Sequence, residues 1–449
     1  MLRKLIYSKF LYPAYRYFKK DKVILHIREL DKNQWFSKER LEKLQHDKLV
    51  CLLNHAAKNV PYYIKIIRQI GLEPEKLALP ENFRLLPYLT KEVIRNNIRD
   101  IISTNLANNS IFRNSTSGST GEALFFYTDT RSLDYRKASV FRNKKWAGYT
   151  MGDKEVLIWG SPIDINKYKR LRNQLHSFIT GSYMISAYEM SKDLMDQHIF
   201  LIQRFKPKII VSYPSILEVF AEHCQKKTHI LFPSLTGVIT SAETLFPDQR
   251  KLFESVFGVK VFNRYGCREF GDIAQECDSH AGMHLNTDRL FLEIIDQHNQ
   301  PCPPGKLGEL YITDLDNYGM PFIRYQIGDS ASWSPNICQC KRGLHLLSQV
   351  EGRSLDVVKT SKGNKIGGTF WTILFKKKPG IKQLQLIQEH IDHIRVLYIP
   401  DGYLNEDSIN YFNRKIREKC GNNMNITYEK VNIIPKTSSG KTRIVISKI

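Results

Sequence analysis

The chain has 449 residues and a formal net charge of +22, from 67 Lys and Arg against 45 Asp and Glu. The composition, with 42% hydrophobic and 25% charged residues, excludes a disordered chain, a collagen-like repeat and a long coiled coil. At roughly 100–200 residues per domain, the length predicts two or three domains. No uncharged apolar run reaches the ~18 residues of a spanning helix. The first twenty residues also lack the apolar core of a secretory signal, so we expect a cytoplasmic protein.

The N-terminal residues are strongly basic. Residues 1–22 hold seven basic residues and one acidic residue, interleaved with Leu, Ile, Phe and Tyr. Two interpretations stay open: a surface helix resting on anionic lipid at the inner face of a membrane, or a helix docked on the protein's own core. Elsewhere the basic residues are spread along the chain without an arginine-rich run or zinc-finger spacing. We therefore expect no specific nucleic-acid partner.

The pattern of apolar residues changes twice along the chain. Residues 1–100 have apolar residues at helical spacing and form a helical N-terminal part of the large domain. Over 101–352, short β-rich runs alternate with helical stretches, which predicts an α/β core with a largely parallel sheet. Within it, strand-turn-strand patterns over 288–334 predict an antiparallel β subdomain. Residues 353–449 have their own strands and helices and predict a small α+β domain.

A loop rich in hydroxyl groups and glycine is the clearest local motif. It comprises Ser115, Thr116, Ser117, Gly118, Ser119, Thr120 and Gly121. Glycines allow backbone N–H groups to approach an anion, and hydroxyl groups add donors, which suits a polyphosphate. The alternative is a solvated linker. A Walker A loop is excluded, because no Gly-Lys-Ser/Thr follows Gly121 and Pro435 stands at the glycine position required by Gly440-Lys441-Thr442.

Six motifs in order resemble those of the adenylate-forming (ANL) superfamily of acyl-CoA synthetases. They are STSGSTGEAL from Ser115, Ser241-Ala242-Glu243, Tyr265-Gly266-Cys267-Arg268-Glu269, Arg324-Tyr325-Gln326-Ile327-Gly328-Asp329, Glu351-Gly352-Arg353, and Pro435-Lys436-Thr437-Ser438-Ser439-Gly440-Lys441. The patterns HAAKNVPYY, LPYLTKE and Tyr-Gly-x-Arg-Glu-Phe are similar to the phenylacetate–CoA ligase family, in its CapK-like branch associated with capsular polysaccharide biosynthesis. The resemblance implies the ANL fold, with a large N-terminal α/β domain and a small mobile C-terminal lid domain over 353–449.

The resemblance also implies a reaction and its residues. A carboxylic acid attacks the α-phosphate of ATP, giving acyl-AMP and pyrophosphate, and the acyl group then passes to coenzyme A. The loop Ser115–Gly121 would hold the β- and γ-phosphates, and Glu269 would hold Mg²⁺. Adenine and ribose would be bound by Ser241, Ala242, Glu243, Tyr265, Gly266 and Asp329. Lys441 would contact the reacting oxygens, and Arg353 would act at the interdomain hinge. The usual hinge position holds Leu355, so Asp356 is an alternative pivot.

Cysteine spacing predicts a second, structural site. Cys277 and His284 lie just after the Glu269 motif, and Cys338 and Cys340 follow the Asp329 motif. Three thiolates and one imidazole match a tetrahedral Zn²⁺ site, and four protein ligands leave no open position for chemistry. His280 is the competing nitrogen ligand, and unrelated buried thiols are the alternative.

Three functions stay open. The first is an acid–thiol ligase that uses ATP, Mg²⁺ and coenzyme A. The second passes the acyl group from acyl-AMP to an amine or sugar acceptor in cell-surface polysaccharide biosynthesis. The third is a non-catalytic, basic, zinc-containing binding protein. The acid is not specified by the sequence, although Trp159, Tyr213, Pro214 and Ser215 are candidates for its pocket.

Overall fold

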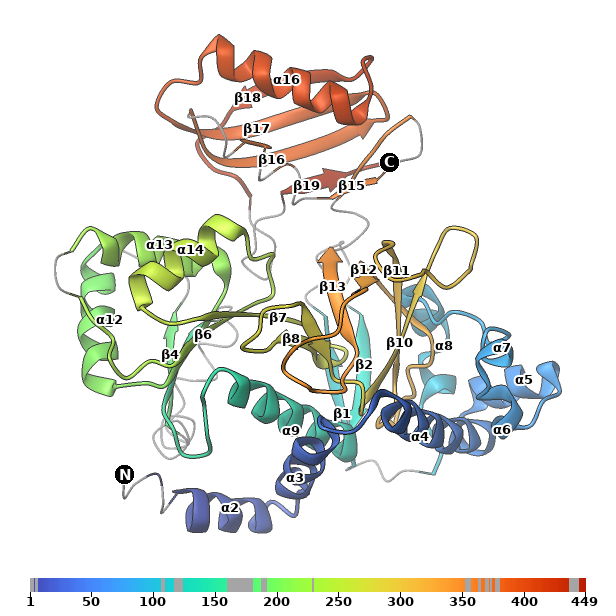
Figure 1. The fold of residues 1–449 in the computed structure, drawn as a ribbon. Helices are drawn as coiled ribbons and strands as arrows, with labels where there is room; N and C mark the ends of the chain where they lie inside the picture. The colour runs from blue at the N-terminus through green and yellow to red at the C-terminus, as the bar shows by residue number, and fades with distance from the viewer. Residues whose placement is uncertain are drawn as a thin grey trace. The chain divides into compact units, whose positions relative to one another are not determined.

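The structure is a computed structural model, and it separates the chain into two compact units (Figure 1). It describes residues 4, 7–105, 110–116, 124–159, 181–186, 192–227, 230–351, 357–361, 365–367, 371, 374–375, 380–435 and 444–449. The large unit comprises Met1–Thr116, Glu122–Ile327 and Ala331–Gln349, and the small unit comprises Ser117–Gly121, Gly328–Ser330 and Val350–Ile449. The main break in the chain thus falls between Gln349 and Val350.

Helices dominate the first hundred residues, as the apolar spacing predicts. They are η1 (Tyr7–Leu11), a π-helical turn, followed by α2 (Tyr12–Phe18), α3 (Val23–Asn33), α4 (Lys38–Asn59), α5 (Pro61–Ile70), α6 (Pro74–Leu77), α7 (Pro80–Phe83) and α8 (Lys91–Ile101). The Ser37 hydroxyl accepts a hydrogen bond from the Arg40 N–H and caps α4. Pro61 opens α5, and Gly71 ends it with a left-handed φ of 73°. None of the described helices combines the length and apolar content needed to span a bilayer.

An eleven-stranded sheet forms the centre of the large unit, in the order β10-β11-β12-β13-β9-β8-β7-β6-β5-β3-β4. Its strands are β3 (Glu155–Trp159), β4 (Ser182–Ser186), β5 (Ile209–Ser212), β6 (Gly237–Ser241), β7 (Val261–Cys267), β8 (Gly271–Glu276), β9 (Met283–Leu285), β10 (Leu290–Ile295), β11 (Gly308–Asp314), β12 (Tyr325–Trp333) and β13 (Leu346–Glu351). Strands β4, β3, β5, β6 and β7 are parallel, and β8 then pairs antiparallel with β7. The strands expected to form an antiparallel subdomain therefore continue the main sheet.

Helices cover both faces of the parallel strands, so these strands are buried on both sides. Ile210 of β5 packs with α12 (Lys192–Phe205), α13 (Pro214–Gln225) and α14 (Pro247–Phe257). Its neighbours Ile209 and Val211 point to the other face, where Phe141 of α9 (Thr130–Trp146) packs. A separate hairpin of β1 (Ile111–Ser115) and β2 (Phe125–Asp129) leads into α9.

The small unit is α+β. Strands β16 (Gly380–His390) and β17 (His393–Asp401) are antiparallel, and β18 (Asn425–Lys430) and β19 (Val445–Ser447) add to them in parallel, in the order β18-β17-β16-β19. Helix α16 (Glu406–Cys420) contributes Phe412 and Ile416 to a core shared with Leu386 and Val396. Strands β14 (Val357–Lys359) and β15 (Lys365–Gly367) form a short antiparallel pair.

A buried ion pair ties α9 to the sheet, and we expect its loss to destabilise the large unit. The fully buried Arg142 donates to Asp288 over 2.7 Å, so Arg142→Met leaves a buried carboxylate without its cation. The free energy of unfolding should fall by about 3–5 kcal/mol. Denaturation followed by tryptophan fluorescence measures this. Arg204→Met, on the exposed face of α12, should stay within about 0.5 kcal/mol of wild type. Unchanged stability of Arg142→Met would contradict this role.

Candidate active site and metal centre

The carboxyl ends of parallel strands gather several predicted site residues at one edge of the large sheet. Trp159 ends β3, Tyr213 follows β5, and Ser241 ends β6. In the register of β6 and β7, Ser241 lies opposite Arg264, so Ala242, directly after β6, and Tyr265 of β7 are the next residues along the two neighbouring segments. This edge is where ligands bind in open α/β sheets, because loops and helix N-termini converge there.

Two aromatic side chains already contact each other at this edge. The rings of Trp159 and Tyr213 stack with their centroids 4.1 Å apart and their planes 29° apart. Pro214 and Ser215 follow as the first residues of α13. The structure therefore brings together the four candidates for an acid pocket that the sequence singled out.

The Ser241-Ala242-Glu243 segment makes a tight turn after β6. Ser241 is buried, and Ala242 has a left-handed φ of 69°, a conformation that costs energy for a residue with a side chain. The Glu243 carboxylate accepts a hydrogen bond of 3.0 Å from the Ser215 N–H. A carboxylate at this position satisfies a donor at the N-terminus of α13 and interacts favourably with its dipole.

Tyr265 and Gly266 lie at the end of β7, where a short turn reverses the chain into β8. The ladder is irregular between these two residues. A Cβ on Gly266 would lie 2.6 Å from the Gly271 carbonyl oxygen, so only glycine allows the two strands to approach this closely. The sequence motif thus includes a residue that the hairpin itself requires.

Glu269 lies in this turn and is only 5% exposed. The hydroxyl of Tyr325 on β12 donates to Glu269 Oε1 over 3.2 Å. Tyr325 is fully buried, and its ring packs against Phe322 and Phe270. A carboxylate held in this way is preorganised, since its hydrogen-bond donor is itself fixed by packing.

Two buried arginines that no sequence motif marks donate hydrogen bonds to the backbone of this turn. Arg136 of α9 donates to the carbonyl oxygens of Arg268, over 3.2 Å, and Glu269. It also pairs with the buried carboxylate of Asp314 at 3.3 Å. Arg289 donates to the Phe270 carbonyl oxygen over 2.8 Å. These contacts fix the backbone of the turn, and a lone arginine in a helix carries no sequence signal for such a role.

The first two residues of the hydroxyl-rich loop lie beside this turn. Ser115 ends β1, and its carbonyl oxygen accepts a hydrogen bond of 3.4 Å from Arg268. Both the N–H and the hydroxyl oxygen of Thr116 bond to the backbone of Leu124, at 2.9 and 3.0 Å. These contacts close the base of the loop. Ser117, Gly118, Ser119, Thr120 and Gly121 lie outside the described residues.

The remaining predicted catalytic residues are only partly described. Asp329 lies on β12, next to Gly328 with a φ of 87°, and is partly exposed. Arg353 and Lys441, with the hinge positions Leu355 and Asp356, lie outside the described residues. Arg324, which opens the Asp329 motif, donates to Glu293 and to the Arg84 and Leu86 carbonyl oxygens, and so anchors the N-terminal helical part.

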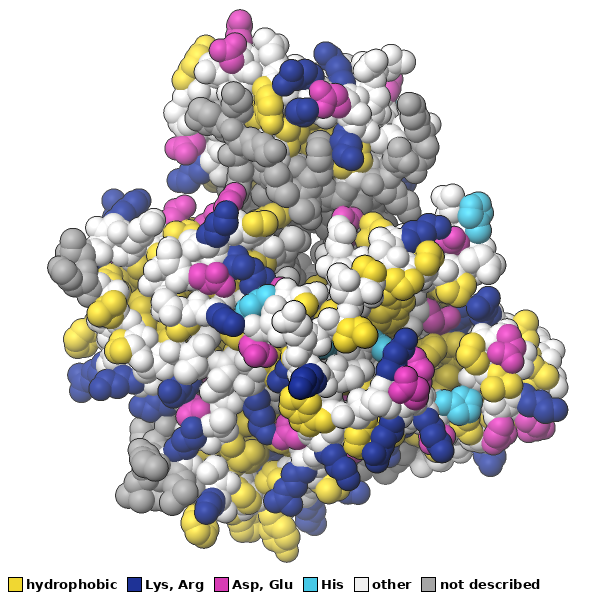
Figure 2. All heavy atoms as spheres, viewed as in Figure 1, with side chains coloured by type: hydrophobic (Ala, Val, Ile, Leu, Met, Phe, Trp, Pro, Cys, Tyr) yellow, Lys and Arg dark blue, Asp and Glu magenta, His cyan; other side chains and the backbone are white. Residues whose placement is uncertain are grey.

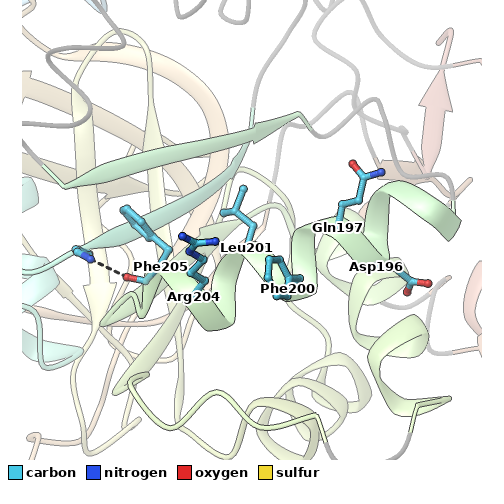
Figure 3. Close-up of a pocket in the computed structure, with 7 residues that line it drawn as sticks. Asp196, Gln197, Phe200, Leu201, Arg204 and Phe205 are labelled. Carbon is cyan, nitrogen blue, oxygen red and sulfur yellow. Dashed lines mark hydrogen bonds between the residues drawn. The ribbon is translucent and has the colours of Figure 1, made fainter.

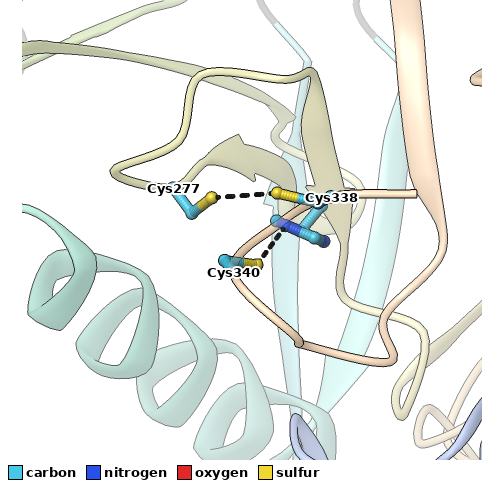
Figure 4. Close-up of side chains that lie close together, drawn as sticks. Cys277, Cys338 and Cys340 are labelled. Atoms are coloured by element: carbon cyan, nitrogen blue, oxygen red, sulfur yellow. Dashed lines mark hydrogen bonds between the residues drawn. The ribbon is translucent and has the colours of Figure 1, made fainter. Parts of the chain in front are cut away.

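The four predicted metal ligands come together in the large unit (Figure 4). Their ligand atoms all lie within 4.8 Å of one another. Cys277 and Cys338 Sγ are 3.6 Å apart, and Cys340 Sγ lies 3.2 Å from His284 Nε2. A tetrahedral site with Zn–S bonds of about 2.3 Å needs sulfur atoms roughly 3.8 Å apart. His280 instead contacts Glu276 and Arg250, so the geometry selects His284.

The surroundings of this cluster suit a metal. His284 Nδ1 donates to the Leu344 carbonyl oxygen at 3.3 Å, which leaves Nε2 as an acceptor facing Cys340. Burial lowers the pKa of His284 to about 4, so the ring is neutral at pH 7. Burial raises the pKa of Cys277 to about 12, so a bound cation would have to displace its proton. Trp146 and Leu41 shield the cluster from water.

A surface depression on α12 lies outside the candidate active site and the cysteine–histidine cluster (Figure 3). It is lined by Lys154, Asp196, Gln197, Phe200, Leu201, Arg204 and Phe205, and Lys154 Nζ donates to the Phe205 carbonyl oxygen over 3.0 Å. None of the site residues predicted from the sequence lines it.

Comparison with known proteins identifies the class of the chain. Residues 102–315 match the AMP-binding enzyme family, and residues 358–448 match the CapK C-terminal domain. The fold is similar to that of a 2-hydroxyisobutyryl-CoA ligase in complex with 2-HIB-AMP, with a TM-score of 0.73 at 18% identity, over 93% of this chain and 91% of that chain. The ANL fold predicted from the motifs is therefore confirmed, and the protein is an adenylate-forming ligase.

The family follows from the sequence relatives. The chain is 26% identical to protein CapK of Staphylococcus aureus, over 91% of this chain and 90% of that protein. It is 25% identical to a phenylacetate-coenzyme A ligase of Thermus thermophilus, over 72% of each chain. These matches support the CapK-like group of the phenylacetate–CoA ligase family, which the motifs predicted.

Proposed function

We propose that this enzyme activates a carboxylic acid with ATP and transfers the acyl group to coenzyme A. In the first step the carboxylate oxygen bonds to the α-phosphorus and pyrophosphate leaves. In the second step the thiol sulfur bonds to the acyl carbon, AMP leaves, and the thiol gives up its proton. Charge develops on phosphate and carbonyl oxygens, so positioning and electrostatic stabilisation supply the catalysis.

The observation that carries this proposal is the meeting of three motifs at one edge of the large sheet. The turn after β6, the Glu269 turn and the start of the hydroxyl-rich loop are neighbours, and Arg268 bonds the last two together. The Ser241-Ala242-Glu243 turn and Tyr265-Gly266 would contact adenine, and the loop Ser115–Gly121 the phosphates. Buried Glu269 offers a carboxylate oxygen of the kind that Mg²⁺ prefers. Asp329 would bind the ribose, with Lys441 and Arg353 acting during chemistry.

The acceptor distinguishes two versions of this function. Coenzyme A is the first candidate, since several relatives carry it in their names. The second is an amine or sugar in the synthesis of a cell-surface polysaccharide, which the similarity to protein CapK over 91% of the chain favours. The buried Glu269 carboxylate accepts a hydrogen bond from Tyr325, and Arg136 holds the backbone of its turn. This preorganisation favours a catalytic role over a non-catalytic binding role.

Pyrophosphate release tests the proposed function. Purified protein with ATP and Mg²⁺ should release pyrophosphate with at least one member of a panel of aryl, amino and short aliphatic acids. Multiple turnovers that require coenzyme A identify the thiol ligase, and turnovers that require an amine identify the alternative. No pyrophosphate with any acid would contradict adenylation.

We predict that Lys441→Ala removes adenylate formation but leaves ATP binding largely intact. Loss of one charge-assisted contact made in the transition state costs roughly 3 kcal/mol, or a hundredfold or more in rate. ATP–pyrophosphate exchange measures this, and Lys448→Ala, an exposed lysine paired with Glu389, is the matched control. Exchange above about half the wild-type rate in Lys441→Ala would refute the role of Lys441.

Asp329→Ala should instead raise the KM for ATP, because ribose contacts also act in the ground state.

We further propose that Cys277, His284, Cys338 and Cys340 bind one structural Zn²⁺. Cys277 follows β8, His284 lies on β9, and Cys338 and Cys340 follow β12, so a bound ion would cross-link these three segments. Its binding free energy would add to the stability of the fold. All four positions would be filled by protein, so the ion would have no place for a substrate.

Metal analysis of freshly purified protein should find about one zinc per chain. Cys338→Ser and His284→Gln should lose the metal and lower the thermal midpoint, with activity falling only in step with the folded fraction. Cys302→Ser and His280→Gln are matched controls, because neither residue belongs to the cluster, and both should retain zinc. Zinc well below half an equivalent, with thiols that titrate freely in the native protein, would remove the site.

A further inference from the structure

The N-terminal helical segment, residues 7–33, has one face docked on the large unit. Tyr7, Tyr12, Val23, Ile27 and Leu30 are buried. The ring of Tyr12 lies 6.0 Å from Phe141 of α9, and Val23, Ile27 and Leu30 pack on Tyr135 and Ala138 of the same helix. The segment is therefore held in place, and its other face is fixed relative to the large unit.

The outer face of η1 and α2 carries large apolar side chains. Phe10 is 66% exposed, Leu11 50%, Tyr17 81% and Phe18 82%. They recur at i, i+1, i+7 and i+8, the spacing that places side chains on one side of a helix. Leu25 of α3 adds a further exposed residue at 59%. Single exposed apolar residues are ordinary, but a cluster of aromatic side chains on adjoining helices marks an interaction surface.

The same segment exposes several basic residues, and its acidic residues are paired with other side chains. The exposed cations are Lys9, Lys19, Lys20, Lys22, Arg28 and Lys32. The Asp21 carboxylate pairs with Arg16 at 2.7 Å, Glu29 accepts from the Tyr135 hydroxyl, and Asp31 pairs with Lys145. Figure 2 shows hydrophobic and basic side chains together over α2 and α3, at the bottom of the view. The exposed surface of this segment thus combines large apolar side chains with positively charged ones.

We propose that this surface, residues 9–32, docks the enzyme on an anionic lipid bilayer. Phe and Tyr side chains suit the boundary between headgroups and acyl chains, and exposed lysines suit anionic headgroups. A second copy of the chain is a poor occupant, because it would bring two sets of six exposed cations together. The proposal is independent of adenylation, since none of the residues assigned to nucleotide or metal lies in this segment.

Vesicle co-sedimentation of the 449-residue protein tests the proposal. Binding should be strong to phosphatidylcholine vesicles containing one-third phosphatidylglycerol, weak to pure phosphatidylcholine, and reduced at about 0.5 M salt. Lys19→Glu with Lys20→Glu should lower the partition coefficient at least about thirtyfold, the factor expected from losing two basic side chains. Phe10→Ser with Phe18→Ser should lower it at both salt concentrations, because the apolar contact is not screened.

Matched double variants elsewhere separate this surface from net charge and general hydrophobicity. Lys226→Glu with Lys251→Glu makes the same charge change, and Phe200→Ser with Leu231→Ser removes side chains that are 65% and 72% exposed. Both should bind vesicles like wild type. Equal loss in these controls, or equal binding to neutral and anionic vesicles, overturns the proposal. A dimer in sedimentation equilibrium that Phe10→Ser with Phe18→Ser converts to a monomer, without vesicle binding, would make the surface a self-interface and overturn it too.

Discussion

One buried guanidinium holds the candidate catalytic turn in place. Arg136 reaches from α9 to the carbonyl oxygens of Arg268 and Glu269 and to the carboxylate of Asp314 on β11. It joins three elements whose sequences lie far apart, and it fixes the backbone of the turn that presents Glu269. An unpaired buried charge costs far more than the pair contributes, so neither Arg136 nor Asp314 can be lost alone without disturbing the turn. Preorganisation of Glu269 therefore depends on packing behind the site as much as on the site itself.

Strand β8 separates the Glu269 turn from the cluster of Cys277, His284, Cys338 and Cys340. Glu269 precedes β8, and Cys277 follows it. A strand of six residues at about 3.3 Å per residue separates the two ends by roughly 20 Å. A metal bound by Cys277, His284, Cys338 and Cys340 would thus act on the far end of β8. It would restrain the strand that carries the turn, and it would lie too far away to touch a nucleotide at the other end.

The sequence predicts this molecule well where signals are local or ordered, and poorly where contacts are long-range. Alternating strands and helices predicted the α/β core, and cysteine spacing identified a cluster that the fold brings together. Spacing left His280 and His284 as alternatives, because only the β9–β13 pairing directs the His284 ring to Cys340. The expected antiparallel subdomain is part of the main sheet, since strand neighbours are set by tertiary pairing. Arg136 and Arg289 had no motif, because they contact backbone carbonyl oxygens of a distant turn and Arg136 pairs with the distant Asp314.

Helix α9 connects these features physically. Tyr135 and Ala138 pack against the N-terminal helices, Arg136 supports the Glu269 turn, and Trp146 packs against the cysteine–histidine cluster. The two interpretations of the basic N-terminus are therefore compatible: one face of the segment packs on α9, and the other remains available to a charged surface. Since Tyr135 and Arg136 are adjacent on one rigid helix, a membrane contact at residues 9–32 would orient the large unit without rearranging the turn. Docking and chemistry would then be separable by mutation, because they use different residues of one helix.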